Sequence, residues 1–399
     1  MVQINKLIHK AIRLIRKNNI NDLWNIIIYK LIKKNYYIHK NRKHTKWAIV
    51  SYVEQPFYYK KDLQFMMGHQ TRREALEMGN ILESLGYNYV IENYESKPRF
   101  LNKKFDLIFG HEPNFIQYAN NNPKAIKIIY SAGTYFVQRN NSIKNRTDFY
   151  NSKHGTNIKY LRLIEPHNGF DIADKIFQIG NPVTIETFPQ HLRQKIKLIN
   201  QSSNFIGKCD IDEKIKNSQN NEFVWMGSVG SILKGLDLVL DYFLTRPDLR
   251  LSIIGKIDDD VYEYYKDSIE KAAHIKYYGF VDVNTDYFKN IITNASFIIF
   301  PSATEGCPGA VISLMQNGLI PIVSKICSFP EVEEMGYVIK AISQDGIEDS
   351  VEWAISLPEK DRYNMQRKAY EYSTNKWSIN TFKHDFREGI IDIINKTSH

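Results

Sequence analysis

The sequence predicts an α/β protein with two doubly wound parallel sheets that face each other across a cleft. Short apolar runs typical of buried strands alternate with helical patterns along most of the chain. At 399 residues, of which 43% are hydrophobic, the chain exceeds the size at which a single core usually keeps growing. A polar stretch at residues 201–221 separates two such halves and reads as a linker. We therefore expect Rossmann-like domains at residues 46–200 and 222–376.

Residues 1–45 are predicted to form a basic amphipathic helical segment. Apolar residues recur at helical spacing over residues 4–15 and 23–32, with lysines and arginines on the other side. Residues 1–46 contain twelve Lys and Arg residues against Asp22 alone, which gives this segment a net charge of +11. Because the whole chain carries +9, the remaining residues carry −2. Such helices can lie on an anionic membrane surface, or pack on the protein itself with their lysines solvated. Nucleic acid is not expected as a partner, because no binding motif accompanies the charge.

The composition favours a cytoplasmic protein. Its three cysteines, Cys209, Cys307 and Cys327, are too few and too scattered for a disulfide framework or a zinc cluster. The chain has no apolar run of about eighteen residues that could span a membrane. Its N-terminus also lacks the apolar core and cleavage site of a signal peptide. Together with the basic segment, these features predict a peripheral protein at the inner face of the cell membrane.

In the first half, one long helix and five strands are predicted. The helix starts at a capping box, Thr71-Arg72-Arg73-Glu74, and ends at Gly86. The apolar runs that predict strands are residues 47–53, 89–92, 107–109, 126–130 and 175–179.

Ligands of such sheets bind at the carboxyl ends of the strands, so residues that directly follow a strand are the candidates for a site. His111 and Glu112 follow one strand, and Ser131 and Gly133 follow the next. His111 can be a base, a hydrogen-bond donor or a structural histidine. His69, in the loop before the predicted helix, is a further candidate.

The linker contains an Asp-X-Asp pair, Asp210 and Asp212. Such a pair can hold a divalent metal under a diphosphate. Here it does not follow a recognisable strand, so we expect a solvated turn and no metal.

The second half opens with a strand at residues 222–226 and a glycine-rich loop. Gly227, Ser228 and Gly230 lie in that loop, and Lys234 follows it. Glycines after a strand let backbone N–H groups approach a diphosphate, and a lysine can neutralise it. Because the loop lacks the Gly-Lys-Ser/Thr ending of a P-loop, an NTPase is disfavoured.

The apolar pattern of residues 297–324 predicts a strand, a turn that starts at Pro301, a helix that begins near Pro308, and a second strand. The turn places Glu305 and Gly306 ahead of a helix N-terminus, which favours anions. A carboxylate beside an anion site suggests a ligand that carries both phosphates and hydroxyls; an ordinary strand-turn-helix unit is the alternative. The remaining predicted elements are residues 236–244, 249–254, 261–273, 275–278, 286–292, 337–339, 346–357, 360–373 and 379–394. The last of them, within residues 377–399, is expected to pack back on the first domain.

Residues 223–237 together with residues 302–324 resemble the donor domain of the group 1 glycosyltransferases (family 4), which have the GT-B fold. The shared features are a glycine-rich loop followed by Lys-Gly, Glu-Gly before a helix, and a Gly-X-X-Pro-X-Val strand at residues 318–323. Gly279-Phe280-Val281 lies at the expected place between them, so the resemblance covers residues 222–340. The first half is similar to bacterial surface-polysaccharide transferases in the runs YSAGTY, NRTDFY and DIADKIFQIGNPVT.

The resemblance implies transfer of a sugar, with retention of configuration and without a metal or other cofactor, from a nucleotide sugar to a glycan or lipid-linked acceptor. Lys234 would pair with the donor diphosphate, and Glu305 would accept hydrogen bonds from the sugar. The N–H groups of Gly309 and Ala310 would face phosphate or sugar. His111 would lie near the reacting centre.

The sequence departs from that family at two places. Ser313 stands where the family has a second glutamate for the ribose, and Ser228-Val229 stand where its loop has an arginine. Lys256 either replaces that arginine or is simply solvated. Two other functions therefore stay open. One is a non-catalytic nucleotide-sugar-binding or scaffold subunit; the other is a sugar-nucleotide epimerase, against which the basic N-terminal segment argues.

Overall fold

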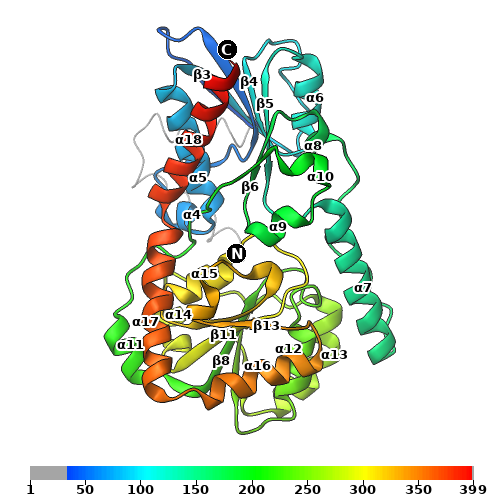
Figure 1. The fold of residues 1–399 in the computed structure, drawn as a ribbon, viewed down its shortest axis with the longest axis vertical. Coiled ribbons are helices and arrows are strands. Elements are labelled where there is room, and N and C mark those ends of the chain that lie inside the picture. The colour runs from blue at the N-terminus through cyan, green and yellow to red at the C-terminus, as the bar shows by residue number, and fades with distance from the viewer. Residues whose placement is uncertain (1–33, 398–399) are drawn as a thin grey trace, which may run out of the picture.

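A computed structural model describes residues 34–397 of the chain. Figure 1 shows two α/β units stacked along the long axis, each built on its own sheet, which confirms the predicted fold class. The amphipathic helices predicted within residues 4–32 lie outside the described residues. Among the residues that are described, no helix combines the length and the apolar character needed to cross a membrane.

The first sheet has seven strands in the order β1-β3-β2-β4-β5-β6-β7. All neighbours are parallel except β1, which pairs with β3 in the antiparallel direction. The strands are β1 (Tyr36–His39), β2 (Lys46–Tyr52), β3 (Tyr87–Asn93), β4 (Leu107–Gly110), β5 (Ile126–Ser131), β6 (Lys175–Gln178) and β7 (Ile196–Leu198). The assignment of residues 36–39 to the helical segment was therefore wrong. These residues instead form a strand whose backbone pairs with β3, which would otherwise be the edge strand of the sheet.

Alternate residues of the first sheet point to opposite faces, as strand geometry requires. In β2, for example, Val50 joins the core under α5 and α18, and Ile49 joins the core under α6 and α8. The helices of this part are α3 (Pro56–Tyr59), α4 (Leu63–Met67), α5 (Gln70–Ser84), α6 (Asn114–Asn121), α7 (Phe136–His154), α8 (Gly169–Ile172), α9 (Pro182–Glu186) and α10 (Gln190–Arg193).

Helix α5 begins at Gln70, and its N-cap lies two residues before the predicted N-cap, Thr71. His69 is the N-cap, and its Nδ1 accepts a hydrogen bond from the Thr71 N–H at 3.3 Å. Glu74, the predicted last member of the box, is buried and accepts hydrogen bonds from the Ser202 N–H and hydroxyl at 2.6 and 2.8 Å. His69 therefore caps the helix, and the Glu74 side chain contacts the linker instead of closing the predicted capping box.

The second sheet is all parallel, with six strands in the order β10-β9-β8-β11-β12-β13. The strands are β8 (Gln219–Gly227), β9 (Arg250–Gly255), β10 (Ile275–Tyr277), β11 (Ala295–Phe300), β12 (Ile320–Ser324) and β13 (Tyr337–Ile339). Helices α12 (Leu236–Phe243), α13 (Asp259–Lys271) and α16 (Gln344–Ser356) cover one face. Helices α14 (Asp286–Ile292), α15 (Gly309–Met315) and α17 (Glu359–Lys376) cover the other. The linker contains a short helix, α11 (Ile211–Asn217), whose N-cap is Asp210.

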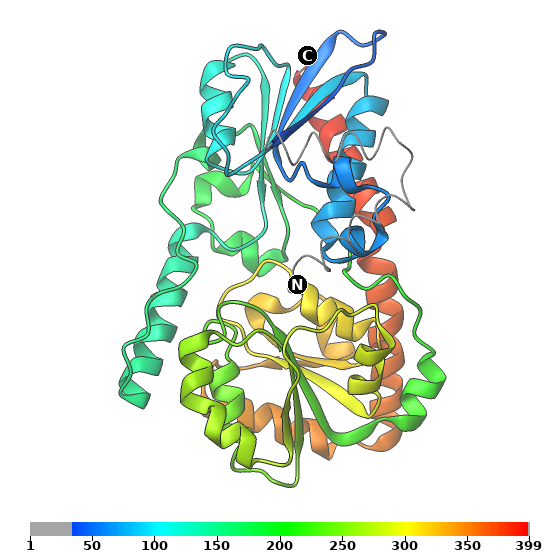
Figure 2. The same cartoon turned by 180° about the vertical axis from the view of Figure 1, so that it is seen from behind.

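Two helical segments cross between the units on opposite sides of the molecule (Figures 1 and 2). On one side, α17 is followed by α18 (Ile379–Thr397), which packs on α5 and places Phe382, Phe386 and Ile390 in the core of the first unit. On the other side, α7 leaves the first unit and runs beside the second. Its Tyr150, with Ile158 beyond it, belongs to the core of the second unit.

Candidate active site

The glycine-rich loop after β8 wraps around the side chain of Lys234. The Lys234 Nζ donates hydrogen bonds to the Ser228 carbonyl and hydroxyl oxygens, both at 3.2 Å, and to the Val229 carbonyl oxygen at 3.1 Å. Gly227 lies so close to the Trp225 ring that an added Cβ would come within 2.4 Å of it. The glycine therefore lets β8 end directly at this loop.

Burial lowers the pKa of Lys234 to about 8, and the Glu305 carboxylate acts in the opposite direction. Lys234 is thus charged at neutral pH and lies within electrostatic reach of Glu305. The two predicted donor-site residues come from the carboxyl ends of neighbouring strands, β8 and β11. The fold brings them together as the doubly wound topology requires.

Of the glycine-rich loop residues predicted to approach a diphosphate, Gly230 has its backbone N–H already engaged. The Asp258 carboxylate accepts hydrogen bonds from the Gly230 N–H at 2.9 Å and from the Ser231 N–H at 2.7 Å. Asp258 follows β9 and is 28 residues from Gly230 in the chain, so spacing along the sequence gave no sign of this contact. In this arrangement the Gly230 N–H is not available to a phosphate.

The turn that carries Glu305 is packed against the first unit. A Cβ on Gly306 would lie 2.5 Å from the Ile179 carbonyl oxygen and 2.6 Å from that of Ala132. The Thr304 hydroxyl is hydrogen-bonded to that of Thr134. Glycine at position 306 thus permits the turn to touch the carboxyl ends of β5 and β6. Glu305 is half-buried at this contact between the two sheets.

Helix α15 begins at Gly309, directly after the turn, and both Gly309 and Ala310 are half-buried. Ser313, one turn later, has no exposed surface. Its hydroxyl donates to the Gly309 carbonyl oxygen at 2.9 Å, so the side chain is satisfied within its own helix. The ribose contact that the resemblance implies for Ser313 is therefore not supported by this geometry.

His111 lies at the end of β4, where the sequence placed it. Its ring is surrounded by those of Tyr52, Tyr94 and Tyr130, with centroid distances of 5.3, 5.4 and 5.3 Å. Burial lowers the pKa of His111 to about 4, although a hydrogen bond with the Tyr130 backbone acts to raise it. The imidazole is thus neutral at pH 7, and it can donate or accept a hydrogen bond without carrying charge.

The other first-unit candidates have partners of their own. Burial raises the pKa of Glu112 to about 7, and its Oε1 lies 3.3 Å from the His167 Nε2. The Ser131 hydroxyl donates to the Gly133 carbonyl oxygen at 3.4 Å. His69 is exposed at the start of α5 and serves as its cap. The acceptor-side roles of these residues stay predictions.

Two arginines near Lys234 were not predicted from the sequence. The Arg162 Nη1 donates to the Val229 carbonyl oxygen at 3.3 Å. Arg139, in the first turns of α7, comes within 3.4 Å of a Cβ built on Gly133. Both arginines lower the pKa of Lys234, which places their charges near its ammonium group. Lys256, the predicted substitute for the missing loop arginine, is exposed and pairs with Asp259 at 3.0 Å instead.

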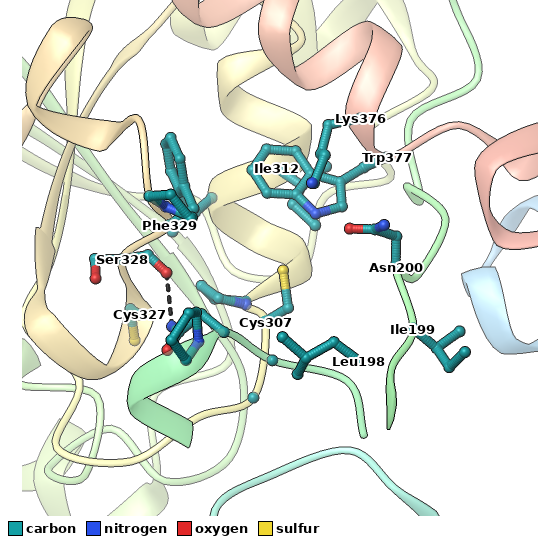
Figure 3. A pocket seen from close by; sticks show the side chains of 17 residues that line it. Leu198, Ile199, Asn200, Cys307, Ile312, Cys327, Ser328, Phe329, Lys376 and Trp377 are labelled. Atoms are coloured by element: carbon teal, nitrogen blue, oxygen red, sulfur yellow. Dashed lines mark hydrogen bonds between the residues drawn. The ribbon is translucent and has the colours of Figure 1, made fainter. Parts of the chain in front are cut away.

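A cavity of about 160 Å³ lies between the units behind the Gly306 turn (Figure 3). The second unit lines it with Cys307, Ile312 and Phe329, and the segments that cross between the units add Asn200 and Trp377. Of the predicted site residues only Gly306 lines it. Neither Lys234 nor Glu305 lines this cavity. Among residues 34–397, no three His, Cys, Asp or Glu side chains are grouped so that they could hold a metal ion.

The fold is similar to those of solved glycosyltransferases. The Anabaena protein HepE, solved with UDP and glucose, is 11% identical with a TM-score of 0.54, over 88% of this chain and 100% of that one. Sucrose-phosphate synthase from Thermosynechococcus elongatus is 10% identical with a TM-score of 0.57, over 88% and 100%. WaaG, a glycosyltransferase involved in lipopolysaccharide biosynthesis, is 11% identical with a TM-score of 0.51, over 87% and 99%.

The chain thus has the fold of the GT-B glycosyltransferases. Residues 209–372 match the family model of glycosyl transferases group 1, the family that the motifs within residues 222–340 resemble. A search of curated proteins by sequence gave no match.

Proposed function

We propose that this protein is a glycosyltransferase that moves a sugar from a nucleotide sugar to a glycan or lipid-linked acceptor, with retention of anomeric configuration and without a metal. The observation that carries the proposal is the placement of Lys234 and Glu305 in the segments after neighbouring strands β8 and β11, within electrostatic reach of each other. A cation and a carboxylate placed in this way suit a ligand that has both phosphates and sugar hydroxyls. The UDP and glucose bound by HepE are ligands of that kind.

The two side chains have separate tasks in this proposal. As the bond between the anomeric carbon and the diphosphate breaks, negative charge grows on the departing phosphate. The Lys234 ammonium stabilises that charge, and burial strengthens its effect because little water screens it. Glu305 accepts hydrogen bonds from sugar hydroxyls and so fixes the sugar for attack. The neutral His111 would offer a hydrogen bond from the opposite unit.

The proposal is tested by transfer of a sugar from a panel of nucleotide sugars to glycan and lipid-linked acceptors, followed by mass spectrometry. We expect Lys234→Ala and Glu305→Gln to lower turnover at least about a hundredfold, the usual effect of losing one transition-state contact. Lys256→Gln, at an exposed cation near the same sheet edge, is the matched control. The anomeric configuration of the product, read by NMR, tests retention, and turnover in EDTA tests metal independence. Unchanged transfer by both site variants would refute the site.

We also propose that the chain works in surface polysaccharide or glycolipid synthesis at the inner face of the cell membrane. The support is the basic segment at residues 1–45 and the lipopolysaccharide pathway in which WaaG takes part. Liposome flotation compares the full chain with a chain that begins at Lys34, which keeps strand β1 intact. Equal flotation of the two would rule out the membrane role of the segment.

A non-catalytic binding subunit is the second candidate. It is favoured by the burial of Ser313 and by the engagement of the Gly230 N–H with Asp258, since both reduce the contacts open to a donor. Calorimetry that shows nucleotide binding, together with no transfer to any acceptor in the assay above, would support this candidate.

A further inference from the structure

The segment between β5 and β6 reaches the glycine-rich loop because it is fixed to the second unit. The Arg146 Nη2 lies 2.6 Å from the Asp237 Oδ2, and both residues are buried between α7 and α12. Tyr150 and Ile158 add their side chains to the core of the second unit. Figure 1 shows the resulting path of α7 beside α12 and α13. The loop that follows α7 is thereby held against the loop of Ser228 to Gly230.

Arg162 is held in this loop in an unusual conformation. Its Cδ would lie 3.3 Å from a Cβ on Gly230, and its Nη1 donates to Val229, so the side chain lies along the glycine-rich loop. Its backbone φ is +66°, in the left-handed region, and within residues 34–397 it is the one non-glycine residue there. Bulky residues avoid that region, and such strain tends to persist where function requires it.

Arg139 approaches the same place from the first turns of α7. Its guanidinium is partly buried, and its Nε has no hydrogen-bond partner among the described residues. Burial lowers the pKa of Arg139, Arg162 lowers it further, and Glu305 raises it. Arg139, Arg162, Lys234 and Glu305 therefore form one electrostatic cluster.

The charges of this cluster do not balance. Arg139, Arg162 and Lys234 contribute three positive charges, against two negative charges on Glu305 and on Asp258, whose oxygens accept hydrogen bonds from backbone N–H groups. A bound anion would offset the excess positive charge. Guanidinium groups suit phosphate because they present several donors in one plane.

We propose that Arg139 and Arg162, both supplied by the segment between β5 and β6, bind the diphosphate of the donor together with Lys234. They take the place of the arginine that the glycine-rich loop lacks at Ser228-Val229. The proposal rests on the proposed function, because it assigns further residues to the same donor site. It also makes the diphosphate a ligand of both units, so that donor binding holds them together.

The test is calorimetry on the full chain with UDP, GDP, ADP and dTDP, and with the matching monophosphates. We expect one diphosphate to bind the wild type, and Arg139→Gln and Arg162→Gln each to weaken that binding about tenfold or more. Monophosphate affinity should fall less, because the terminal phosphate is absent. Lys144→Gln on α7 and Lys159→Gln in the following loop remove exposed cations of the same segment, and they should leave both affinities unchanged.

Two further variants separate ligand binding from a purely structural role of Arg162. Arg162→Lys keeps the charge and should restore part of the diphosphate affinity. Arg162→Gly accepts a positive φ, so its melting temperature should not fall below that of the wild type, while diphosphate affinity falls as in Arg162→Gln.

The outcomes distinguish the two proposals. If the wild type binds a diphosphate and the ratio of diphosphate to monophosphate affinity is the same in Arg139→Gln and Arg162→Gln, the arginine assignment is overturned and the proposed function stands. If the wild type binds none of the nucleotides, the proposed function fails and the arginine assignment fails with it.

Discussion

Lys234 combines burial with a positive charge, and under the proposed function this combination sets the pH range of donor binding. An exposed lysine would stay charged to about pH 10. Burial lowers the pKa of Lys234 to about 8, so its ammonium is present at neutral pH and is lost at moderately alkaline pH. The charged form is the one below the pKa, and it is the form that binds an anion.

Diphosphate binding should therefore weaken as the pH rises above about 8. Well above that pH the affinity should fall about tenfold per pH unit, because Lys234 must first take up one proton to bind the anion. Titration calorimetry between pH 6.5 and 9.5 measures this dependence. Lys234→Arg should remove most of it, because a guanidinium keeps its proton throughout this range. A wild type and a Lys234→Arg variant with the same pH dependence would contradict the assignment.

Single residues also show what the sequence could and could not predict about the site. The positions of Lys234, Glu305 and His111 were predictable because each lies in the segment that follows a strand, and the topology fixes where such segments lie. Their roles stay predictions. Asp258 was missed because its contacts are with a loop far away in the chain. Ser313 was placed in the pocket by analogy with a longer side chain, whereas a short hydroxyl can satisfy itself within its own helix.

At the scale of elements, α7 is held to the second unit by two ion pairs in different surroundings. Arg146 and Asp237 are both buried. Lys153 and Asp241 also approach to 2.6 Å, but the lysine side chain is 38% exposed. Removing one partner of a buried pair leaves the other charge unpaired in a poorly solvated place, whereas an exposed pair contributes little.

Arg146→Met should lower the free energy of unfolding by roughly 3–5 kcal/mol, and the double variant Arg146→Met/Asp237→Leu should recover most of that loss. Lys153→Gln is the matched control and should cost less than about 1 kcal/mol. Chemical denaturation of the four proteins measures these differences. A double variant no more stable than Arg146→Met would show that α7 is held mainly by other contacts.

Among the elements, strands and helices with one continuous apolar pattern were predictable and α7 was not. Only five of its nineteen residues are buried, namely Phe136, Ile143, Arg146, Thr147 and Tyr150. Because its two ends contact different units, no single apolar stripe runs along it. Strand β1 was missed for a related reason, since its four residues lie at a half-exposed edge and follow a basic stretch that favoured a helix.

At the scale of the whole molecule, α18 carries the end of the chain from the second unit back to the first. Phe386 is fully buried there, and its ring packs edge to face on Phe109 and Phe177 at 5.1 and 5.9 Å. One face of the first sheet therefore depends on a helix that enters from the other unit.

Phe386→Ala should cost roughly 3–5 kcal/mol through loss of apolar contacts and the cavity left behind. Because α18 then docks less firmly, we expect calorimetric unfolding to separate into two transitions, with the first unit melting earlier. His384→Ala, at an exposed position of the same helix, should leave the profile unchanged. A single cooperative transition in Phe386→Ala, shifted uniformly to lower temperature, would show that the units unfold as one.

The path of α7 limits how far the second half of the chain can be separated from the first. The family match covers residues 209–372, but Tyr150 and Ile158, which complete the core of that half, lie well before it. A fragment excised at the boundaries of the match would expose the apolar surface that these two side chains cover and would leave Asp237 without Arg146. In this protein the second half cannot be exchanged by itself, and a chimera that takes this half from a relative must bring its own α7 or adapt its surface to this one.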